Sequence, residues 1–162
     1  MVDLTGISSR AVHDGYAYWL NRKGRELIPS RQDIDPLIDI PQLVPNMMLK
    51  DFQRDPPDIR YRLIGTRVRP HLSRDWTGIW MSEIPFQRPP STIWNNHIWV
   101  VENRAPLVAR PPYVGPHKDF LYIESIILPL GADHETVDML MVFVDFIGPD
   151  RPPVAWISAE SA

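Results

Sequence analysis

The sequence of 162 residues contains no cysteine. Disulfide bonds, thiolate metal sites, a cysteine nucleophile and a thiol-attached chromophore are therefore excluded. The histidines do not supply a metal site in their place, because His13, His71, His117 and His134 lie apart without the spacing of metal ligands. We therefore predict no metal centre.

Long apolar runs and an excess of basic charge are also missing. The longest apolar run in the second half of the chain is Met139–Val144, which is far shorter than the ~20 residues needed to span a bilayer. The N-terminus shows no signal peptide. The net charge of −3 gives no basic footprint for nucleic acid. We expect a cytoplasmic protein that binds neither membranes nor nucleic acid.

Catalytic signatures are absent from the sequence as well. It contains no G-x-S-x-G, H-E-x-x-H, P-loop or G-x-G-x-x-G pattern. We predict that the protein is not an enzyme. Polar groups with shifted pKa values gathered in a cleft would favour the opposite view, an enzyme on a related α+β scaffold.

Proline is abundant, with 18 residues against an average of about 5%. Short elements joined by stiff loops are expected in a single domain. We predict a helical extension over residues 1–28, the domain proper over residues 29–148 and a Pro-rich tail over residues 149–162.

The clearest helix runs from about Arg10 to Lys23, with Ser9 as its N-cap and Gly24 beyond its end. Its apolar stripe must pack either on the outer face of its own sheet or on a second subunit. The strand expected at 138–147 is apolar on both faces, so both faces need cover. We predict a homodimer, with this stripe in the interface. The stripe consists of Val12, Tyr16, Trp19 and Leu20.

The central stretch Ile59–Trp80 combines a strand, a glycine turn at Gly65 and a short broken helix. A longer helix from about Thr92 to Asn103 follows, capped by Ser91. Two strands precede the helix, and three strands follow it.

This stretch resembles a family of stand-alone bacterial PAS-like domains. The resemblance is carried by Y-R-L-x-G-T at 61–66, D-x-T-G at 75–78 and P-S-R-x-D-I-D-P at 29–36. It implies an α+β fold with a five-stranded antiparallel sheet and helices on one face, to which the N-terminal helix is added. It also implies a sensor whose long helix walls a ligand pocket. Any signal would pass to a separate output protein or to another copy of the chain.

The resemblance places a set of aromatic, apolar and polar side chains around that pocket. The same side chains could instead fill a solid core, as in a protein-interaction adaptor that binds no ligand. An empty cavity would distinguish the sensor from the adaptor. The candidates are Tyr61, Trp76, Trp80, Trp94, His97, Ile98, Val101, Arg110, Tyr122, Glu124 and Met141.

Two of these candidates have specific alternatives. His97 occupies the helix that supplies the axial ligand in haem-binding PAS relatives, but a histidine on an apolar face is also a common core residue. The absence of cysteine excludes cysteinyl-flavin photochemistry. Glu124 interrupts an apolar strand and needs a partner if it is buried, either Arg110 or Tyr113; otherwise it anchors a ligand or lies at an edge.

Arginines are concentrated between positions 60 and 74. They form either a solvated face paired with nearby aspartates or a surface for an anion or a partner.

Overall fold

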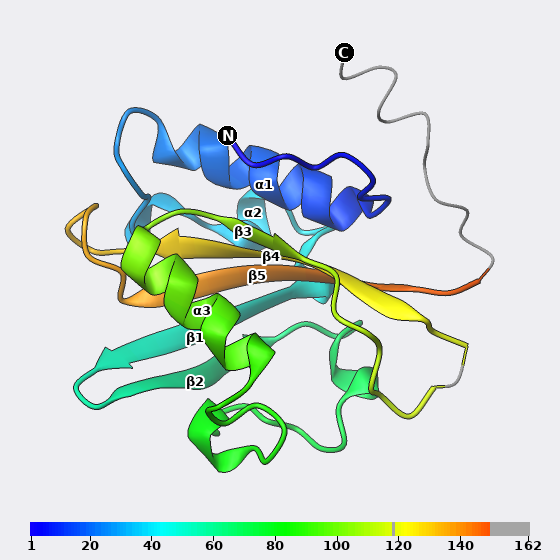
Figure 1. The fold of residues 1–162 in the computed structure, drawn as a ribbon. Coiled ribbons are helices and arrows are strands. Elements are labelled where there is room, and N and C mark those ends of the chain that lie inside the picture. The colour runs from blue at the N-terminus through cyan, green and yellow to red at the C-terminus, as the bar shows by residue number, and fades with distance from the viewer. Residues whose placement is uncertain (118, 150–162) are drawn as a thin grey trace.

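The computed structural model describes residues 1–117 and 119–149. Its centre is an antiparallel five-stranded sheet with the strand order β2-β1-β5-β4-β3 (Figure 1). The fold predicted from the sequence is confirmed, including the two strands before the long helix and the three after it. The strands are β1 (Met47–Arg54), β2 (Pro57–Ile64), β3 (Leu107–Ala109), β4 (Tyr122–Leu130) and β5 (Met139–Ile147).

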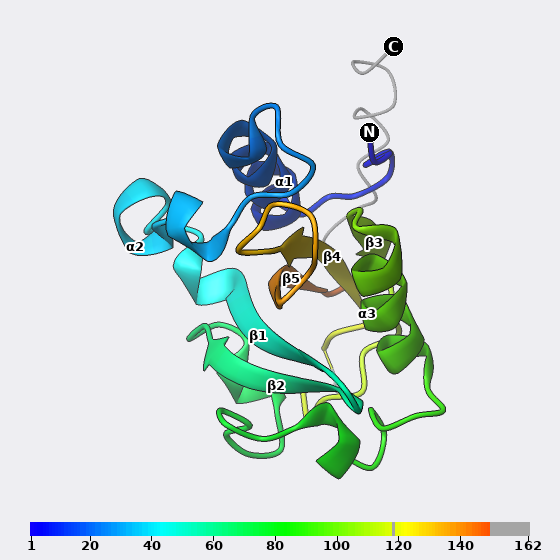
Figure 2. The same ribbon diagram turned by 90° about the vertical axis from the view of Figure 1, so that its left-hand side faces the viewer.

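Two longer helices lie on opposite sides of this sheet (Figures 1 and 2). Helix α1 (Arg10–Lys23) packs on β4 and β5, and helix α3 (Thr92–Asn103) lies over β4 from the other side. The remaining helical elements are single turns. They are α2 (Pro36–Asp39) and the 3₁₀ turns Arg31–Asp33, Val44–Asn46, Arg69–His71 and Met81–Glu83.

Helix α1 has both of the caps that the sequence suggested. The Ser9 hydroxyl accepts a hydrogen bond from the backbone N–H of Val12, and Gly24 ends the helix with a φ of 56°. At Gly15 the helix touches the sheet, since a Cβ there would lie 2.3 Å from the Phe143 ring. The lack of a side chain therefore allows this close approach.

The apolar stripe of α1 packs against the core of the same chain. Val12, Tyr16 and Trp19 are buried in its own core, and Trp19 Nε1 donates to the carbonyl of Pro129 at 2.9 Å. Leu20 packs against the same core at partial exposure. This corrects the placement of the stripe in a dimer interface, because three of its side chains face the sheet beneath the helix. The homodimer stays a prediction that needs another surface.

The pleat of the sheet divides the core into two parts. Along β5, Val142, Val144 and Phe146 point toward the α3 side, and Phe143 points toward α1. The strand is thus covered on both faces by one chain, with α1 over one of them. The pleat also decides which strand residues can reach a pocket beside α3.

A register shift brings two particular residues together. β1 and β2 pair Leu49 with Leu63 and then Lys50 with Tyr61, so Arg62 is an extra residue in β2. This bulge places the Tyr61 ring beside the Lys50 side chain on the α3 side of the sheet.

Among the described residues, no helix is long and apolar enough to cross a bilayer. The Pro-rich tail predicted over residues 149–162 lies outside the described residues from position 150 onward.

Candidate ligand-binding site

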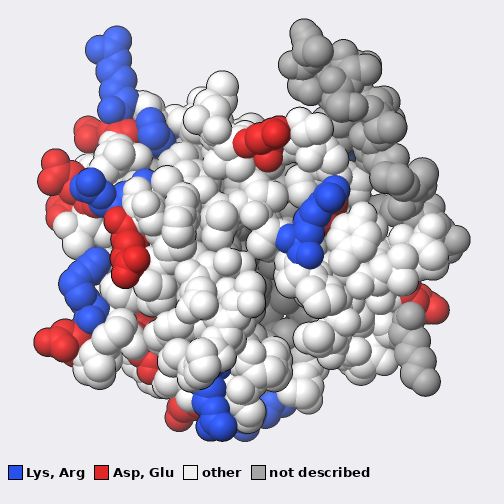
Figure 3. Space-filling model, in the orientation of Figure 1, with Lys and Arg blue, Asp and Glu red and all other residues white. Residues whose placement is uncertain are grey.

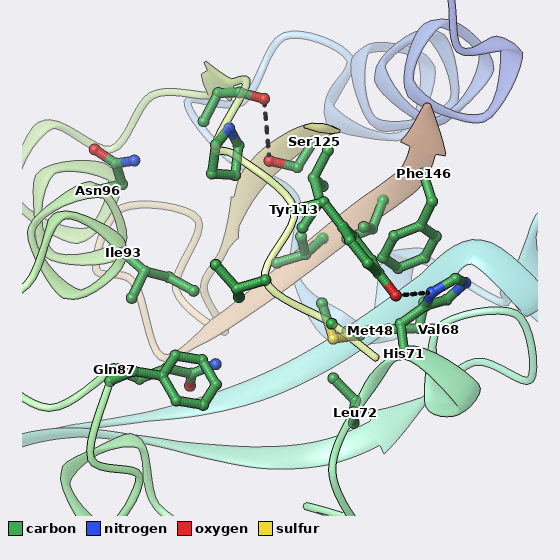
Figure 4. A pocket seen from close by; sticks show the side chains of 18 of the residues that line it. Met48, Val68, His71, Leu72, Gln87, Ile93, Asn96, Tyr113, Ser125 and Phe146 are labelled. Carbon is green, nitrogen blue, oxygen red and sulfur yellow. Dashed lines mark hydrogen bonds between the residues drawn. The ribbon is translucent and has the colours of Figure 1, made fainter. Parts of the chain in front are cut away.

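A cavity of about 790 Å³ lies between α3 and the sheet. Figure 3 shows the molecular surface hollowed beside this helix, and the side chains around the opening are mostly uncharged. Strands β1, β2, β4 and β5 form its floor, α3 forms one wall, and the loop at 110–116 crosses its mouth (Figure 4). The volume is within the range of small-molecule pockets.

Aromatic rings supply much of the apolar wall. Tyr61 and Trp76 lie with ring centroids 5.6 Å apart, and Phe86 lies 5.6 Å beyond Trp76. Phe146 stacks on His71 at the other end, at a centroid distance of 3.6 Å. Such a wall offers contact area to an apolar or aromatic ligand.

Lys50 is the main polar group of the floor, and its side chain is enclosed, with 1% of the residue exposed. Its Nζ lies 2.8 Å from His97 Nε2 and 4.6 Å from the centre of the Tyr61 ring. Among the described residues, no carboxylate forms an ion pair with Lys50. Burial lowers the pKa of Lys50 to about 7.

His97 extends from α3 and has both ring nitrogens engaged. Nδ1 lies 2.7 Å from the Ile93 carbonyl, which can only accept, so this nitrogen carries the proton. Nε2 is left as the acceptor for Lys50. Burial, and next the nearby Lys50, hold the pKa of His97 well below its usual value. The imidazole is therefore neutral at physiological pH.

Tyr61 and Gln87 form a second buried polar pair. The Tyr61 hydroxyl donates to Gln87 Oε1 at 2.8 Å, and both residues are almost completely enclosed. Burial raises the pKa of Tyr61 well above its usual value, so the phenol stays neutral. The face of its ring is then available to the Lys50 cation.

A side-chain contact lies at the mouth of the cavity. Tyr113 reaches from the loop between β3 and β4 to His71, where its hydroxyl lies 2.8 Å from Nδ1 (Figure 4). Burial, and next His117, lower the pKa of His71. At Gly115 a Cβ would lie 2.3 Å from the Tyr113 hydroxyl and 2.9 Å from the His71 carbonyl oxygen, so a larger residue there would displace this contact.

Four of the predicted pocket residues line the cavity: Tyr61, Trp76, His97 and Arg110. The structure corrects the other seven. On α3, His97 lines the cavity together with Thr92, Ile93 and Asn96, and the remaining α3 candidates do not line it. The corrected residues are Trp80, Trp94, Ile98, Val101, Tyr122, Glu124 and Met141.

The strand candidates were wrong because of the pleat. Met141 and Glu124 alternate with residues such as Val142 and Ser125 that do line the cavity, so they point away from it. Trp80 instead lies under the Arg60 guanidinium, at 5.3 Å from the ring centre.

Glu124 has a structural role at the start of α1. Its Oε1 accepts from the backbone N–H groups of Ser8 at 3.0 Å and Ser9 at 2.8 Å, and from the Ser8 hydroxyl at 2.9 Å. Its Oε2 lies 3.8 Å from Arg110 Nη2. The structural pair with Arg110 is therefore present, and the serine contacts place a negative charge at the positive end of a helix.

The residues present do not fit a haem held by His97. Its Nδ1–H is committed to a backbone carbonyl, and its Nε2 faces the Lys50 side chain at 2.8 Å, where an iron would have to bind. No cluster suited to a metal ion occurs within 1–117 and 119–149.

The arginine-rich stretch is largely paired with aspartate. Arg60 and Arg62 lie 3.2 and 3.5 Å from Asp51, and Arg69 lies 3.3 Å from Asp75. These exposed pairs correspond to the solvated face that the sequence suggested.

Sequence reasoning missed Lys50, Gln87 and the loop at the mouth. Lys50 did carry a signal, because it is a charge within the apolar run that opens β1 and shares the parity of Met48, another cavity residue. Gln87 carried no such signal. The prolines at 111, 112 and 116 indicated a stiff loop but not where it would lie.

The comparison with protein families agrees with this architecture. The family model for the PAS domain matches residues 7–143. The chain belongs to the PAS domain family. The match includes α1, so the helix that covers the second face of the sheet lies within the matched region. Neither the curated proteins nor the solved structures contain a match to this PAS domain.

Proposed function

We propose that this PAS domain binds a small, largely apolar molecule in the cavity beside α3. We also propose that it signals the presence of this ligand to another protein or to a second copy of itself. Family membership makes the chain a generic sensory or regulatory domain. The observation that supports ligand binding is the cavity of about 790 Å³, with aromatic walls and a buried amine.

The cavity volume also weighs against the adaptor alternative. An adaptor with a filled core would need no space between the long helix and the sheet, and the aromatic side chains here enclose a space rather than fill it. Lys50, His71 and His97 line the cavity with lowered pKa values, which is the observation that favours an enzyme. We favour regulation because the family is one of sensory or regulatory domains, and because the Ile93 carbonyl and Lys50 already engage both ring nitrogens of His97.

The test uses N-phenyl-1-naphthylamine, an uncharged probe whose fluorescence rises in apolar surroundings. We expect saturable binding by the full chain and a higher melting temperature in its presence, because binding to the folded state alone stabilises it. A matched variant, Val142→Trp, places an indole in the cavity and is expected to abolish probe binding while the fold, measured by circular dichroism, is kept. No binding by the unmodified chain would contradict the proposal.

One observation favours a second candidate, which is reaction with a carbonyl compound. A buried lysine with a pKa near 7 is partly an unprotonated amine at neutral pH, as imine formation requires. The Lys50 amine would add to an aldehyde and release water. Incubation with decanal and borohydride, followed by peptide mapping, tests this: a reduced adduct on Lys50 but not on Lys23 supports it, and an unmodified Lys50 rejects it.

A further inference from the structure

The charged side chains around the cavity are of one sign. Lys50 and Arg110 belong to its lining, and no aspartate or glutamate is found among the described lining residues. Arg110 is already engaged, because its Nη2 donates to the Gly6 carbonyl and lies 3.8 Å from Glu124. Lys50 is thus a cation without a counter-charge among the described residues.

The immediate contacts of Lys50 leave it able to bind an anion. An ammonium group has three N–H donors, and His97 Nε2 accepts one of them at 2.8 Å. The Tyr61 ring, at 4.6 Å, stabilises a cation through its face but carries no net charge. A buried charge costs free energy unless it is paired. A carboxylate placed beside Lys50 would offset that cost by pairing with the ammonium group.

The titratable groups facing Lys50 do not supply that charge. His97 faces it from α3 and Tyr61 from β2, and both are neutral at physiological pH. His71 and Tyr113, which also line the cavity, contact each other at the mouth. Asp51 is the next residue in β1, but its carboxylate lies 3.2 Å from Arg60 and so belongs to the exposed arginine pairs.

We infer that the natural ligand of this cavity is an amphipathic carboxylic acid, whose carboxylate pairs with Lys50 and whose apolar part lies along the aromatic wall. The inference rests on the proposed ligand-binding function and adds the chemical class of the ligand. The low pKa of Lys50 fits it, because an anion beside the amine favours the protonated form, and binding above about pH 7 then takes up a proton.

The experiment compares two probes that share one chain. Decanoate carries the carboxylate, and decanamide replaces it with a neutral group of similar size. Each displaces N-phenyl-1-naphthylamine from the full-length protein, measured at about pH 6 and about pH 9. We expect decanoate to bind at least about tenfold more tightly than decanamide at the lower pH. This preference should shrink by about tenfold or more at the higher pH, where free Lys50 is mostly neutral.

Two variants assign the preference to one side chain. Lys50→Met keeps an unbranched side chain and removes the charge, and we expect both probes to bind it with affinities equal within about twofold. Lys23→Met removes a lysine from the end of α1, on the other side of the sheet, and should leave the preference unchanged. Circular dichroism checks the folding of both. If Lys50→Met does not fold, the pH dependence in the unmodified chain still tests the inference.

The other outcomes separate the inference from the proposed function. If the naphthylamine probe binds but decanoate binds no better than decanamide, or does not bind, the carboxylate inference fails and the cavity keeps its function. If decanoate keeps its preference in Lys50→Met, the anchor is not Lys50 and the inference also fails. If none of the three molecules binds, the proposed function and the inference fail together.

Discussion

The two faces of the sheet bury a charge in opposite ways. Under α1, Glu124 is 0% exposed, yet two backbone N–H groups, a hydroxyl and a guanidinium surround it. Beside α3, Lys50 is equally enclosed, but its ammonium group contacts a neutral imidazole and an aromatic ring. One face therefore carries a charge surrounded by donors, and the other carries an ammonium group at the floor of a cavity with no counter-ion among the described residues.

This difference indicates where stability and function lie. A carboxylate at a helix N-terminus with several donors stabilises the fold. A buried amine without a counter-ion destabilises it, and such groups are common at binding and reactive sites. Substitutions on each face should therefore change the stability of the chain in opposite directions.

The largest effect is expected from Trp19→Ala on the packed face. Trp19 is 2% exposed and hydrogen-bonds to Pro129, so its removal leaves a cavity and removes a donor to that carbonyl. We expect a loss of about 3–5 kcal/mol in the free energy of unfolding, measured by urea denaturation. Trp99, which is exposed on α3, is the matched control, and Trp99→Ala should cost less than about 1 kcal/mol. Similar costs for the two would mean that α1 is not packed as described.

On the cavity face, replacing Lys50 should instead raise the free energy of unfolding. The pKa of Lys50 in the folded chain, about 7, is below the ordinary lysine value of 10.5, so the unfolded chain binds more protons between these pH values. The free energy of unfolding therefore rises with pH through that window, and the full penalty is present below about pH 7. We expect Lys50→Met to stabilise the chain by roughly 2–4 kcal/mol at about pH 6, because each pKa unit corresponds to about 1.4 kcal/mol and some contacts with His97 are lost.

The same variant should lose its advantage in alkaline solution. Near pH 10 the neutral amine of the unmodified chain carries little penalty, so the two free energies of unfolding should converge. If the Lys50→Met variant were less stable than the unmodified chain at about pH 6, the Lys50 charge would not be uncompensated.

Glu124→Gln tests the satisfied charge on the other face. The amide keeps the shape but weakens acceptance from Ser8 and Ser9 and removes the attraction to Arg110. We expect a loss of about 1–3 kcal/mol, measured by thermal or urea unfolding. Glu102→Gln, at an exposed position of α3, is the control and should change little. An unchanged or raised stability in Glu124→Gln would show that the two faces do not differ in this way.

The smallest effect is expected at the mouth of the cavity. Tyr113→Phe keeps the ring and removes the hydroxyl that bonds to His71, so we expect a cost of about 1 kcal/mol and faster release of N-phenyl-1-naphthylamine in stopped-flow fluorescence. Tyr122→Phe, on a strand residue outside the cavity lining, is the control. Equal release rates in the two variants would mean that the Tyr113 contact does not slow the exit of the probe from the cavity.

The sequence predicted the elements better than it predicted the site, for a physical reason. Ser9, Ser91 and Gly24 act on neighbouring residues, so both long helices could be placed from local patterns. The face on which Glu124 or Met141 lies could not be predicted from the sequence. Both β4 and β5 are apolar on both sides, so the alternation of residues along the strand does not show which side faces the cavity.

The charged contacts were harder still to predict. Glu124 meets Ser9 across 115 positions of sequence, and Lys50 meets His97 across 47. Neither pair leaves a local pattern. The available sign was a lysine within the apolar start of β1, on the same side of the strand as Met48, and this residue lies at the floor of the cavity.

The most direct test is a titration of the Lys50 amine by nuclear magnetic resonance, in free protein and with decanoate. The sequence has only three lysines, so the Lys50 signal can be assigned from its absence in Lys50→Met. The account predicts a pKa of about 7 in the free protein and a clear rise when decanoate binds. A pKa near the ordinary lysine value that decanoate leaves unchanged would contradict it.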